Sequence, residues 1–412
     1  MPLSNIIILG AGPCGLSTAI ALAKASTPEN PIHVTLVEVR EKLQTIGGTL
    51  NMTPLAMRYL DHLGVGDGLR RGGIEMKDGL DCVSLRTGRR IGNIWGSIGA
   101  IRTIRHSVVD SLLQKIEESH KDAIDIRWGK RAVEITESKD RITIRFDNEE
   151  SLHADILLGC DGLHSAVRRL WVDPLRKETF TGRVLVMGFE ESGKTPVMRL
   201  SNGEVALRDT AVITTQKGML LASKYEPSRQ KTYFAHTMYM EEPAGDARDG
   251  WKILGGDQDA VRKEVVGCFD AGRVSGVQET VAMCEDWHLY PVYMLPAEGF
   301  WFRGRAMLMG DAAHAGESTG LAIEDGILLA KVLERRGSRT VEQLFSDFET
   351  VRRPVIEKYH RDAVWAMKNG FRETTWLGSI FIEWGIWLFL LVKRWRQDDH
   401  FAQDVRKVSL PA

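Results

Sequence analysis

Short apolar runs alternate with helical segments near the start of the chain. Residues 5–9 (NIIIL) form an apolar run of the kind that is buried in a parallel sheet. Residues 16–25 are rich in Ala and Leu and predict a helix, and residues 33–37 (HVTLV) predict a second strand. The pattern recurs later, with strands expected at 154–159 and 305–309 and a helix over 321–335. Strands that alternate with helices in this way indicate an α/β fold with a parallel sheet.

A different pattern fills the middle of the chain. Between residues 176 and 289, short apolar runs are separated by turn residues, which predicts a mixed or antiparallel sheet inserted into the α/β unit. Alternation along residues 232–239 divides the side chains between two faces, one with Tyr233, Thr237 and Tyr239 and the other with Phe234, His236 and Met238. We expect one face to line a cavity, which makes Tyr239 and His236 the candidates for a catalytic side chain. The alternative for each side chain is packing against covering helices.

Polar and helical segments should follow this sheet. Residues 241–256 predict a polar stretch, residues 257–271 a helix, and residues 340–369 further helices. The helices over 340–369 would close the α/β unit.

The last apolar segment has an unusual composition. Residues 376–392 (WLGSIFIEWGIWLFLLV) contain one charged residue, Glu383, and are followed by Lys393, Arg394 and Arg396. A membrane-spanning helix needs about 20 apolar residues, and an internal carboxylate further disfavours spanning. Tryptophans beside a basic flank are typical of a helix that lies on a membrane surface. The alternative is a C-terminal helix packed on the body of the protein or on a second copy.

Length, charge and cysteine content narrow the class of protein. A chain of 412 residues is long enough for two lobes. Its formal net charge of −1 argues against a nucleic-acid partner. The five cysteines form no CxxC pair and no His/Cys cluster with zinc spacing, so we expect no metal site. Their odd number and scatter favour a reduced, cytoplasmic location.

A glycine-rich loop joins the first strand to the first helix. Residues 10–15 (GAGPCG) have the spacing G-x-G-x-x-G at a strand–helix junction, the context that distinguishes this fingerprint from a chance match. Gly10 permits the tight turn, Gly12 lets the backbone approach a pyrophosphate, and Gly15 allows close helix–strand packing. Glu38 ends the second strand, where a carboxylate can accept hydrogen bonds from a ribose. The motif predicts a bound dinucleotide but does not distinguish FAD from NAD.

Two aspartates follow later strands. Asp161 lies in CDGLHSAVR (160–168) after the strand at 154–159, and Asp311 lies in GDAAH (310–314) after the strand at 305–309. Open α/β sheets bind ligands at the carboxyl ends of their strands, where a short acid can reach a sugar or ribityl hydroxyl. Each aspartate alone is a weak signal, because Asp-Gly is also a common turn sequence. Their weight comes from their combination and order with the glycine loop.

Taken in order, these motifs resemble those of class A FAD-dependent monooxygenases of the p-hydroxybenzoate hydroxylase fold. Within this class the sequence most resembles fungal salicylate-hydroxylase-like enzymes. The resemblance extends from residue 5 to about residue 365. It is carried by GAGPCG (10–15), VEVR (37–40), CDGLHSAVR (160–168) and GDAAHA (310–315). Residues 47–64 and 104–113 match the family more weakly. It implies a Rossmann-type FAD-binding domain with an inserted mixed β-sheet substrate domain and C-terminal helices.

The resemblance also implies which residues contact the cofactor. Gly10, Gly12 and Gly15 would bind the pyrophosphate, Glu38 the adenosine ribose and Asp311 the ribityl chain, and Gly48 would lie beside the isoalloxazine ring. The other implied contacts are Arg40, Arg105, Asp161, Gly310 and Gly320. Asp161 belongs to a motif that such families use for both FAD and NAD(P)H, whereas His314 would support its loop rather than act as a base. For Arg105 the alternative is a solvated residue at a helix start, and for Gly48 an ordinary loop glycine.

The same resemblance divides the chain into lobes. The FAD-binding lobe would comprise 1–75, 102–175 and 290–370, the substrate lobe 76–101 and 176–289, and the apolar, Trp-rich C-terminal helix and tail 371–412. The implied reaction uses NAD(P)H and O₂ to hydroxylate or epoxidise an apolar, aromatic or terpenoid-like molecule through a flavin C4a-hydroperoxide, in secondary metabolism. An NAD(P)-dependent reductase without flavin is one alternative, but it leaves Asp161 and Asp311 unexplained.

One segment departs from the family pattern. The stretch from His314 to Glu324 is several residues shorter than is usual in such enzymes, although Ser318 or Thr319 can still cap the following helix. Backbone N–H groups of this loop would face the flavin. A flavin-binding protein with impaired catalysis is therefore the second alternative.

Overall fold

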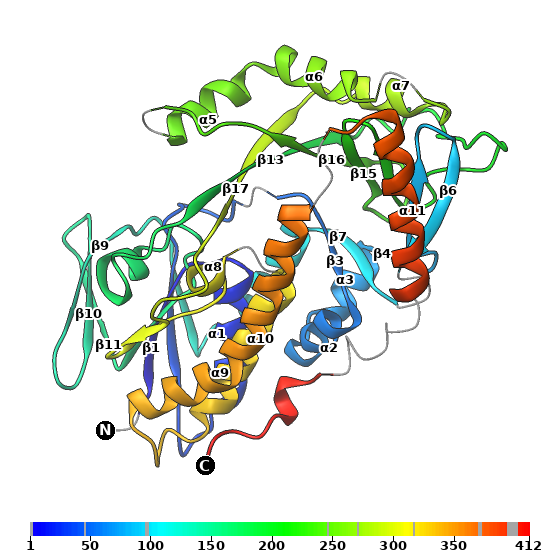
Figure 1. The fold of residues 1–412 in the computed structure, drawn as a ribbon. Coiled ribbons are helices and arrows are strands. Elements are labelled where there is room, and N and C mark those ends of the chain that lie inside the picture. The colour runs from blue at the N-terminus through cyan, green and yellow to red at the C-terminus, as the bar shows by residue number, and fades with distance from the viewer. Residues whose placement is uncertain are drawn as a thin grey trace.

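The computed structural model describes residues 3–44, 47–94, 99–244, 247–269, 272–315, 318–369, 373–393 and 403–412. The chain forms two lobes, one around a largely parallel sheet and one around a larger mixed sheet (Figure 1). The α/β class and the inserted mixed sheet that the sequence predicts are both present.

The first lobe is built on a six-stranded sheet with the order β18-β19-β12-β1-β2-β8. Its strands are β1 (Asn5–Leu9), β2 (His33–Val37), β8 (Ile124–Arg127), β12 (Ile156–Gly159), β18 (Phe302–Arg303) and β19 (Ala306–Leu308). All pairings are parallel except that of the short edge strand β18. The chain runs outward from β1 through β2 to β8 and then returns to β12 on the other side. The strand order therefore reverses beside β1, where open α/β sheets bind their ligands.

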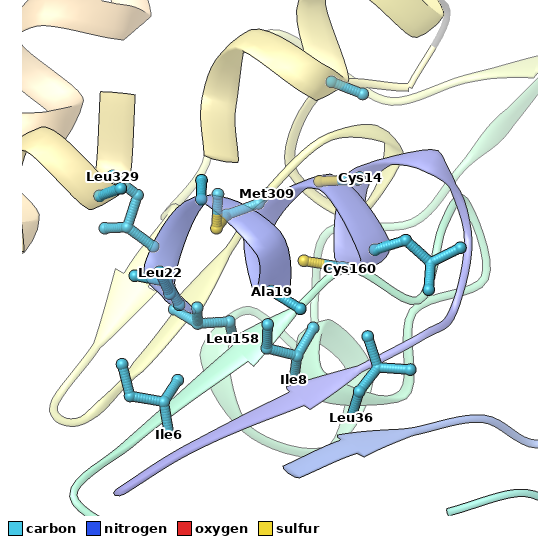
Figure 2. Close-up of a cluster of buried hydrophobic side chains, with 14 of the residues drawn as sticks. Ile6, Ile8, Cys14, Ala19, Leu22, Leu36, Leu158, Cys160, Met309 and Leu329 are labelled. Atoms are coloured by element: carbon cyan, nitrogen blue, oxygen red, sulfur yellow. The ribbon is translucent and has the colours of Figure 1, made fainter. Parts of the chain in front are cut away.

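Helices cover this sheet and bury its apolar runs. They are α1 (Pro13–Ala25), α4 (Arg105–Ser119), α8 (Asp311–His314), α9 (Thr319–Leu333) and α10 (Val341–Asn369). Helix α1 packs against α4 and α9. Figure 2 shows Ile6, Ile8 and Leu158 of the strands beneath Ala19 and Leu22 of α1. The strands can be apolar on both faces because neither face of this central region meets water.

The second lobe contains a seven-stranded sheet with the order β17-β13-β16-β15-β14-β5-β6. Its strands are β5 (Leu80–Ser84), β6 (Arg89–Ile94), β13 (Thr179–Glu190), β14 (Thr210–Thr215), β15 (Gly218–Lys224), β16 (Thr232–Tyr239) and β17 (Trp287–Met294). Only the β14–β5 pairing is parallel. Strands β5 and β6 come from the early segment, 76–101, that the family resemblance predicts for the substrate lobe.

The two faces of this sheet have different neighbours. Val184, Val186 and Phe234 pack in one core with helices α5 (Ala247–Gly256), α6 (Gln258–Gly267) and α7 (Val277–Ala282). A smaller cluster on the other face, Met187, Tyr225, Tyr233 and Ala235, packs against Ile104 of the first lobe. The second face therefore looks toward the parallel sheet.

Two small sheets and two helices complete the first lobe. One sheet has the order β3-β7-β4 and the other the order β11-β10-β9. These elements are β3 (Thr49–Met52), β4 (Ile74–Glu75), β7 (Ile101–Ile104), β9 (Ala132–Glu137), β10 (Ile142–Phe146), β11 (Ser151–Ala154), α2 (Pro54–Leu63) and α3 (Gly66–Gly72). Strand β7 runs directly into α4, so it links the small sheet to the helical layer.

Several predicted boundaries need correction. The polar stretch expected over 241–256 contains helix α5, and Asp257 caps α6 by accepting a hydrogen bond from the Ala260 N–H. The helices expected over 340–369 are one helix, α10, with Pro354 inside it. The Trp-rich segment forms a single helix, α11 (Trp376–Lys393), which packs beside β6 of the second lobe (Figure 1).

Candidate functional site

Four segments singled out from the sequence converge at one edge of the parallel sheet. Gly10 follows β1, Glu38 follows β2, Asp161 lies two residues after β12, and Gly310 lies two residues after β19. Because these strands are parallel, their carboxyl ends share an edge. The glycine loop and the Asp161 turn lie on adjacent strands where the order reverses, which is the position of a ligand site in open α/β sheets.

The glycine loop is closely packed on its inner side and open on its outer side. A Cβ atom on Gly10 would lie 2.4 Å from the Cys160 carbonyl oxygen, and one on Gly15 would lie 1.9 Å from the Gly10 carbonyl oxygen. A Cβ on Gly12 would meet nothing within 4 Å. The open side lies at the start of α1, whose first N–H groups can bind a phosphate. The loop therefore fits a pyrophosphate.

Glu38 is buried and fixed by this loop. Its Oε2 accepts a hydrogen bond of 2.9 Å from the Ala11 N–H, and its Oε1 accepts one of 3.0 Å from the Arg40 N–H. The Arg40 guanidinium lies 3.4 Å from Oε1 on the solvent side. A carboxylate has further lone pairs after these bonds, so Glu38 can still accept from ribose hydroxyls.

Asp161 shapes the turn after β12. Its Oδ2 accepts hydrogen bonds from the N–H groups of Ala166 at 2.6 Å and Val167 at 3.2 Å. Its Oδ1 is buried without a hydrogen-bond partner among the described residues. Burial raises the pKa of this carboxyl. The unsatisfied oxygen is free to accept a hydrogen bond from a ligand or a water molecule.

Asp311 and Arg105 mark the far end of the same edge. Burial raises the pKa of Asp311, and the positive charge of Arg105 opposes that rise. The Arg105 N–H donates to the Gly48 carbonyl oxygen at 3.1 Å, and a Cβ on Gly47 would lie 2.7 Å from the Arg105 Cδ atom. The segment around Gly48 is therefore held beside the helix that begins at Arg105.

Tyr233 connects this end to the substrate lobe. A Cβ on Gly48 would lie 2.0 Å from the Tyr233 Oη atom, so only glycine allows the tyrosine ring to approach so closely. Tyr233 belongs to the face of the seven-stranded sheet that looks toward the first lobe. The sequence singled out Tyr233 only as one of several side chains on a predicted face. Its contact with Gly48 joins segments far apart in the chain, and no local pattern predicts it.

The two candidate catalytic side chains lie on opposite faces of the substrate sheet. His236 points to the helix-covered face, where its Nδ1 lies 2.9 Å from the Met219 carbonyl oxygen and its ring meets Phe269 edge-on. Burial lowers the pKa of His236. Tyr239 is 38% exposed at the end of β16, beneath the guanidinium of Arg183. We assign no acid–base step to either residue.

A buried charge network fixes the loop that carries Asp311. His314 Nε2 lies 2.8 Å from Asp325 Oδ2, which also accepts a 2.8 Å hydrogen bond from the Gly310 N–H. Arg352 of α10 binds Asp325 and Glu324 at 2.6 Å each. His314 thus supports its loop. The role of Arg352 was missed because its partners lie more than twenty-five residues away in the sequence.

The short loop after His314 lies partly outside the described residues, namely at 316–317. Ser318 caps α9, as expected, by accepting from the Leu321 N–H at 3.4 Å. Gly320 lies in the first turn of α9, where a Cβ would lie 3.4 Å from that of Ala56. The start of α9 is therefore intact beside the site.

The fold and this edge define a dinucleotide-binding oxidoreductase class, and comparison with known proteins narrows it. A family model described as FAD binding domain matches residues 4–251. The chain belongs to this family, and within it to the class A flavin monooxygenases, so its cofactor is FAD. The open side of Gly12 and the free Oδ1 of Asp161 fit such a cofactor.

Relatives extend across most of the chain. Salicylate hydroxylase of Pseudomonas putida is 24% identical over 395 residues, which is 88% of this chain and 84% of the relative. For 3-hydroxybenzoate 6-hydroxylase of Klebsiella oxytoca the identity is 24% over 84% of each chain. The structure of Klebsiella pneumoniae HpxO complexed with FAD and uric acid has a TM-score of 0.66 and 21% identity, covering 94% of this chain and 97% of that one. The last comparison supports the fold.

Proposed function

We propose that this protein is an FAD-dependent monooxygenase that uses NAD(P)H and O₂ to hydroxylate or epoxidise an apolar, aromatic or terpenoid-like small molecule. The observation that carries the proposal is the contact of Gly48 with Tyr233 of the substrate sheet. Gly48 is hydrogen-bonded to Arg105, whose positive charge acts on Asp311. The contact with Tyr233 brings the flavin end of the dinucleotide site against a second lobe. Two of the named relatives act on aromatic acids, a hydroxybenzoate and salicylate.

The sheet face above this point suits an apolar substrate. Phe189 packs against Tyr233 and Tyr225 with ring centroids 5.1 Å and 5.8 Å apart. Leu185 and Leu221 extend the same cluster. Such side chains bind an apolar ring and exclude water from it.

Different residues of the protein hold different parts of the cofactor. FAD, when bound, supplies the redox chemistry, by accepting a hydride from NAD(P)H and activating O₂. The glycine loop and Glu38 anchor the adenosine and phosphate end. Asp311, held by the network behind it, orients the flavin end, while Arg105 provides positive charge there.

The visible spectrum of the purified protein, with and without added FAD, tests the cofactor. NADPH and NADH consumption under air, with a panel of phenols, aromatic acids and terpenoid alkenes, then tests turnover. We expect a yellow protein whose NAD(P)H oxidation rises with an accepted substrate and yields an oxygenated product. A colourless protein that takes up no FAD would refute the proposal. A yellow protein that no panel member stimulates would support impaired catalysis from the short loop.

We further propose that α11 docks the enzyme on a membrane surface in the cytoplasm. No helix in the described part of the chain meets the length and hydropathy that crossing a bilayer requires. The single acid of α11, Glu383, faces inward and binds Arg86 at 2.5 Å and Ser84 at 2.6 Å. The outward side is apolar and includes Phe381, Trp384, Trp387, Phe389 and Val392, with Phe381 76% exposed.

Two features favour lipid over a second copy as the occupant. On a helical wheel the exposed apolar side chains cover more than half of the circumference, wider than a flat protein partner contacts. The helix is rich in tryptophan and ends at Lys393, and Arg394 and Arg396 come next in the sequence. This composition suits an anionic lipid interface.

Flotation with phosphatidylcholine–phosphatidylserine vesicles tests the membrane proposal. The wild type should float with the vesicles, and a Phe381→Ser, Trp384→Ser double variant should lose most of this binding. Phe300→Ser is the matched control, because Phe300 is 69% exposed outside α11. Equal flotation of all three proteins, or dimerisation without lipid that the double variant abolishes, would contradict the proposal.

A further inference from the structure

Arg102 is a buried arginine without an acidic partner. It lies in the middle of β7, opposite Asn51 of β3 and Ile74 of β4, and is 2% exposed. Its Nε donates to Ser223 Oγ at 2.6 Å and its Nη1 donates to Asn51 Oδ1 at 2.6 Å. Among the described residues, its Nη2 has no hydrogen-bond partner, and none of their ion pairs involves Arg102.

Arg168 and Arg352, which are buried more completely than Arg102, are each neutralised by an acidic partner. Arg168 pairs with Glu178 at 3.0 Å, and Arg352 pairs with Glu324 and Asp325. A buried charge that lacks a counter-charge is unfavourable. Burial accordingly lowers the pKa of Arg102 to about 10. Buried Arg176 and Arg336 also lack an ion pair among the described residues, but each donates to a backbone carbonyl oxygen at 2.5 Å. Arg102 differs in that its unpartnered Nη2 belongs to a strand at the junction of the two lobes.

The vacant Nη2 belongs to a face that looks into the junction of the two lobes. Residues paired directly across antiparallel strands share a face, so Thr49, Asn51, Arg102 and Ile104 lie together. Thr49 Oγ1 is also buried and has no hydrogen-bond partner in the part of the chain that the structure describes. Ile104 packs on the cluster that contains Tyr233. Burial raises the pKa of Tyr233 to about 12, and the charge of Arg102 opposes this, so the two groups are close enough to interact.

We propose that Arg102, assisted by Thr49 and Tyr233, binds a carboxylate of the substrate. This inference rests on the proposed function and narrows the substrate to an apolar acid. The carboxylate would accept hydrogen bonds from Nη2 and from the Thr49 hydroxyl, while the apolar body contacts the Phe189–Tyr233 cluster. A planar guanidinium is well suited to such an ion, because it offers directed, charge-assisted donors.

Paired ligands on the FAD-loaded enzyme test this assignment. Benzoate, 1-naphthoate and farnesoic acid are each titrated beside the corresponding amide, with the visible flavin spectrum and NAD(P)H oxidation as readouts. We expect at least one acid to bind tighter than its amide. Arg102→Met should weaken the binding of that acid roughly tenfold to a hundredfold, which is the loss expected for a charged hydrogen bond. The affinity for the corresponding amide should change by less than about threefold.

Two further variants keep the test decisive. Arg199→Met removes an exposed arginine of the second lobe and should leave the acid preference unchanged. Arg102→Lys keeps the charge without the planar fork and should retain an intermediate preference, which covers the case in which Arg102→Met does not fold. Absence of acid preference in the wild type would overturn the assignment.

The flavin itself is the other anion that could satisfy Arg102, and it gives a different result. In that case Arg102→Met would weaken FAD binding and lower the flavin reduction potential, without changing the acid-to-amide ratio. That outcome would also overturn the substrate assignment. Failure of the proposed function would instead appear as absent flavin or absent NAD(P)H oxidation in the wild type.

Discussion

The glycines of the loop at 10–15 are required for different physical reasons. At Gly15 a methyl group would lie 1.9 Å from a backbone oxygen, so the fold itself needs glycine there. At Gly12 a methyl group would enter open space, and the backbone φ of −81° is one that alanine adopts readily. Glycine is therefore needed at position 12 for ligand binding rather than for folding.

Substitution at these two positions should separate folding from cofactor binding. Gly12→Ala should leave the thermal stability of the apoprotein unchanged and weaken FAD binding by about tenfold or more, because the methyl group occupies phosphate space. Gly15→Ala should destabilise the apoprotein as well. Apoprotein melting temperature and FAD titration measure the two effects. Normal FAD affinity in Gly12→Ala would place the phosphates elsewhere.

Asp325 is a second residue whose contribution can be measured, here as a contribution to the free energy of unfolding. Asp325 is fully buried and binds Arg352, His314 and the Gly310 N–H. Burial favours the neutral acid, but Arg352 and His314 outweigh it and hold the pKa of Asp325 at about 2. Asp325→Asn leaves Arg352 short of one partner and should lower the free energy of unfolding by about 3 kcal/mol at neutral pH.

The pH dependence follows from that depressed pKa. A carboxyl with a pKa of about 2 in the folded chain and about 3.9 in the unfolded chain stabilises fully above pH 4 and loses its contribution as pH falls toward 2. The difference between wild type and Asp325→Asn should shrink over that interval in denaturant titrations. Asp67→Asn, at a side chain 90% exposed, is the control and should change stability little. A constant difference across pH would contradict the assigned pKa.

At the scale of elements, helix α11 is attached through its one acid. Glu383 is 13% exposed and meets Arg86, which also stacks over Trp376. Loss of a charged hydrogen bond of roughly 1.5–3 kcal/mol should raise the population of undocked helix at least tenfold. We therefore expect Arg86→Ala to speed chymotryptic cleavage within α11 by that factor. Arg89→Ala, at an exposed neighbour in β6, should leave the rate unchanged.

Elements with a strong local pattern were predictable from the sequence, and others were not. Strands β1, β2 and β16 match the predicted ranges, because apolar runs and alternation directly encode burial. Helix α5 was missed because the polar residues of 241–256 hide its packing, which depends on Trp251 in the distant core. The junction of Gly48, Tyr233 and Arg102 depends on lobe packing, so no window of sequence contains it.

At the scale of the molecule, the C-terminal segment is tied to the dinucleotide site. Lys331 of α9 donates to the carbonyl oxygens of Arg406 and Val408 at 2.6 Å and 2.7 Å, and Val405 lies in the core of the first lobe. Deletion of 403–412 leaves these donors unpaired and exposes apolar surface. We expect a lower melting temperature and faster release of FAD, measured by recovery of flavin fluorescence on dilution.

A single hydroxyl group connects this segment to the loop of Asp311. Tyr59 Oη donates to Glu324 at 2.9 Å and accepts from the Val405 N–H at 2.9 Å, and Glu324 binds Arg352, which holds Asp325. Tyr59→Phe keeps the ring and removes both bonds, which should cost about 1–3 kcal/mol and accelerate FAD release less than the deletion does. Lys331→Met loosens the segment without touching Glu324 and should affect melting more than FAD release. If the deletion speeds FAD release while Tyr59→Phe does not, the coupling runs through α9 rather than through this chain of hydrogen bonds.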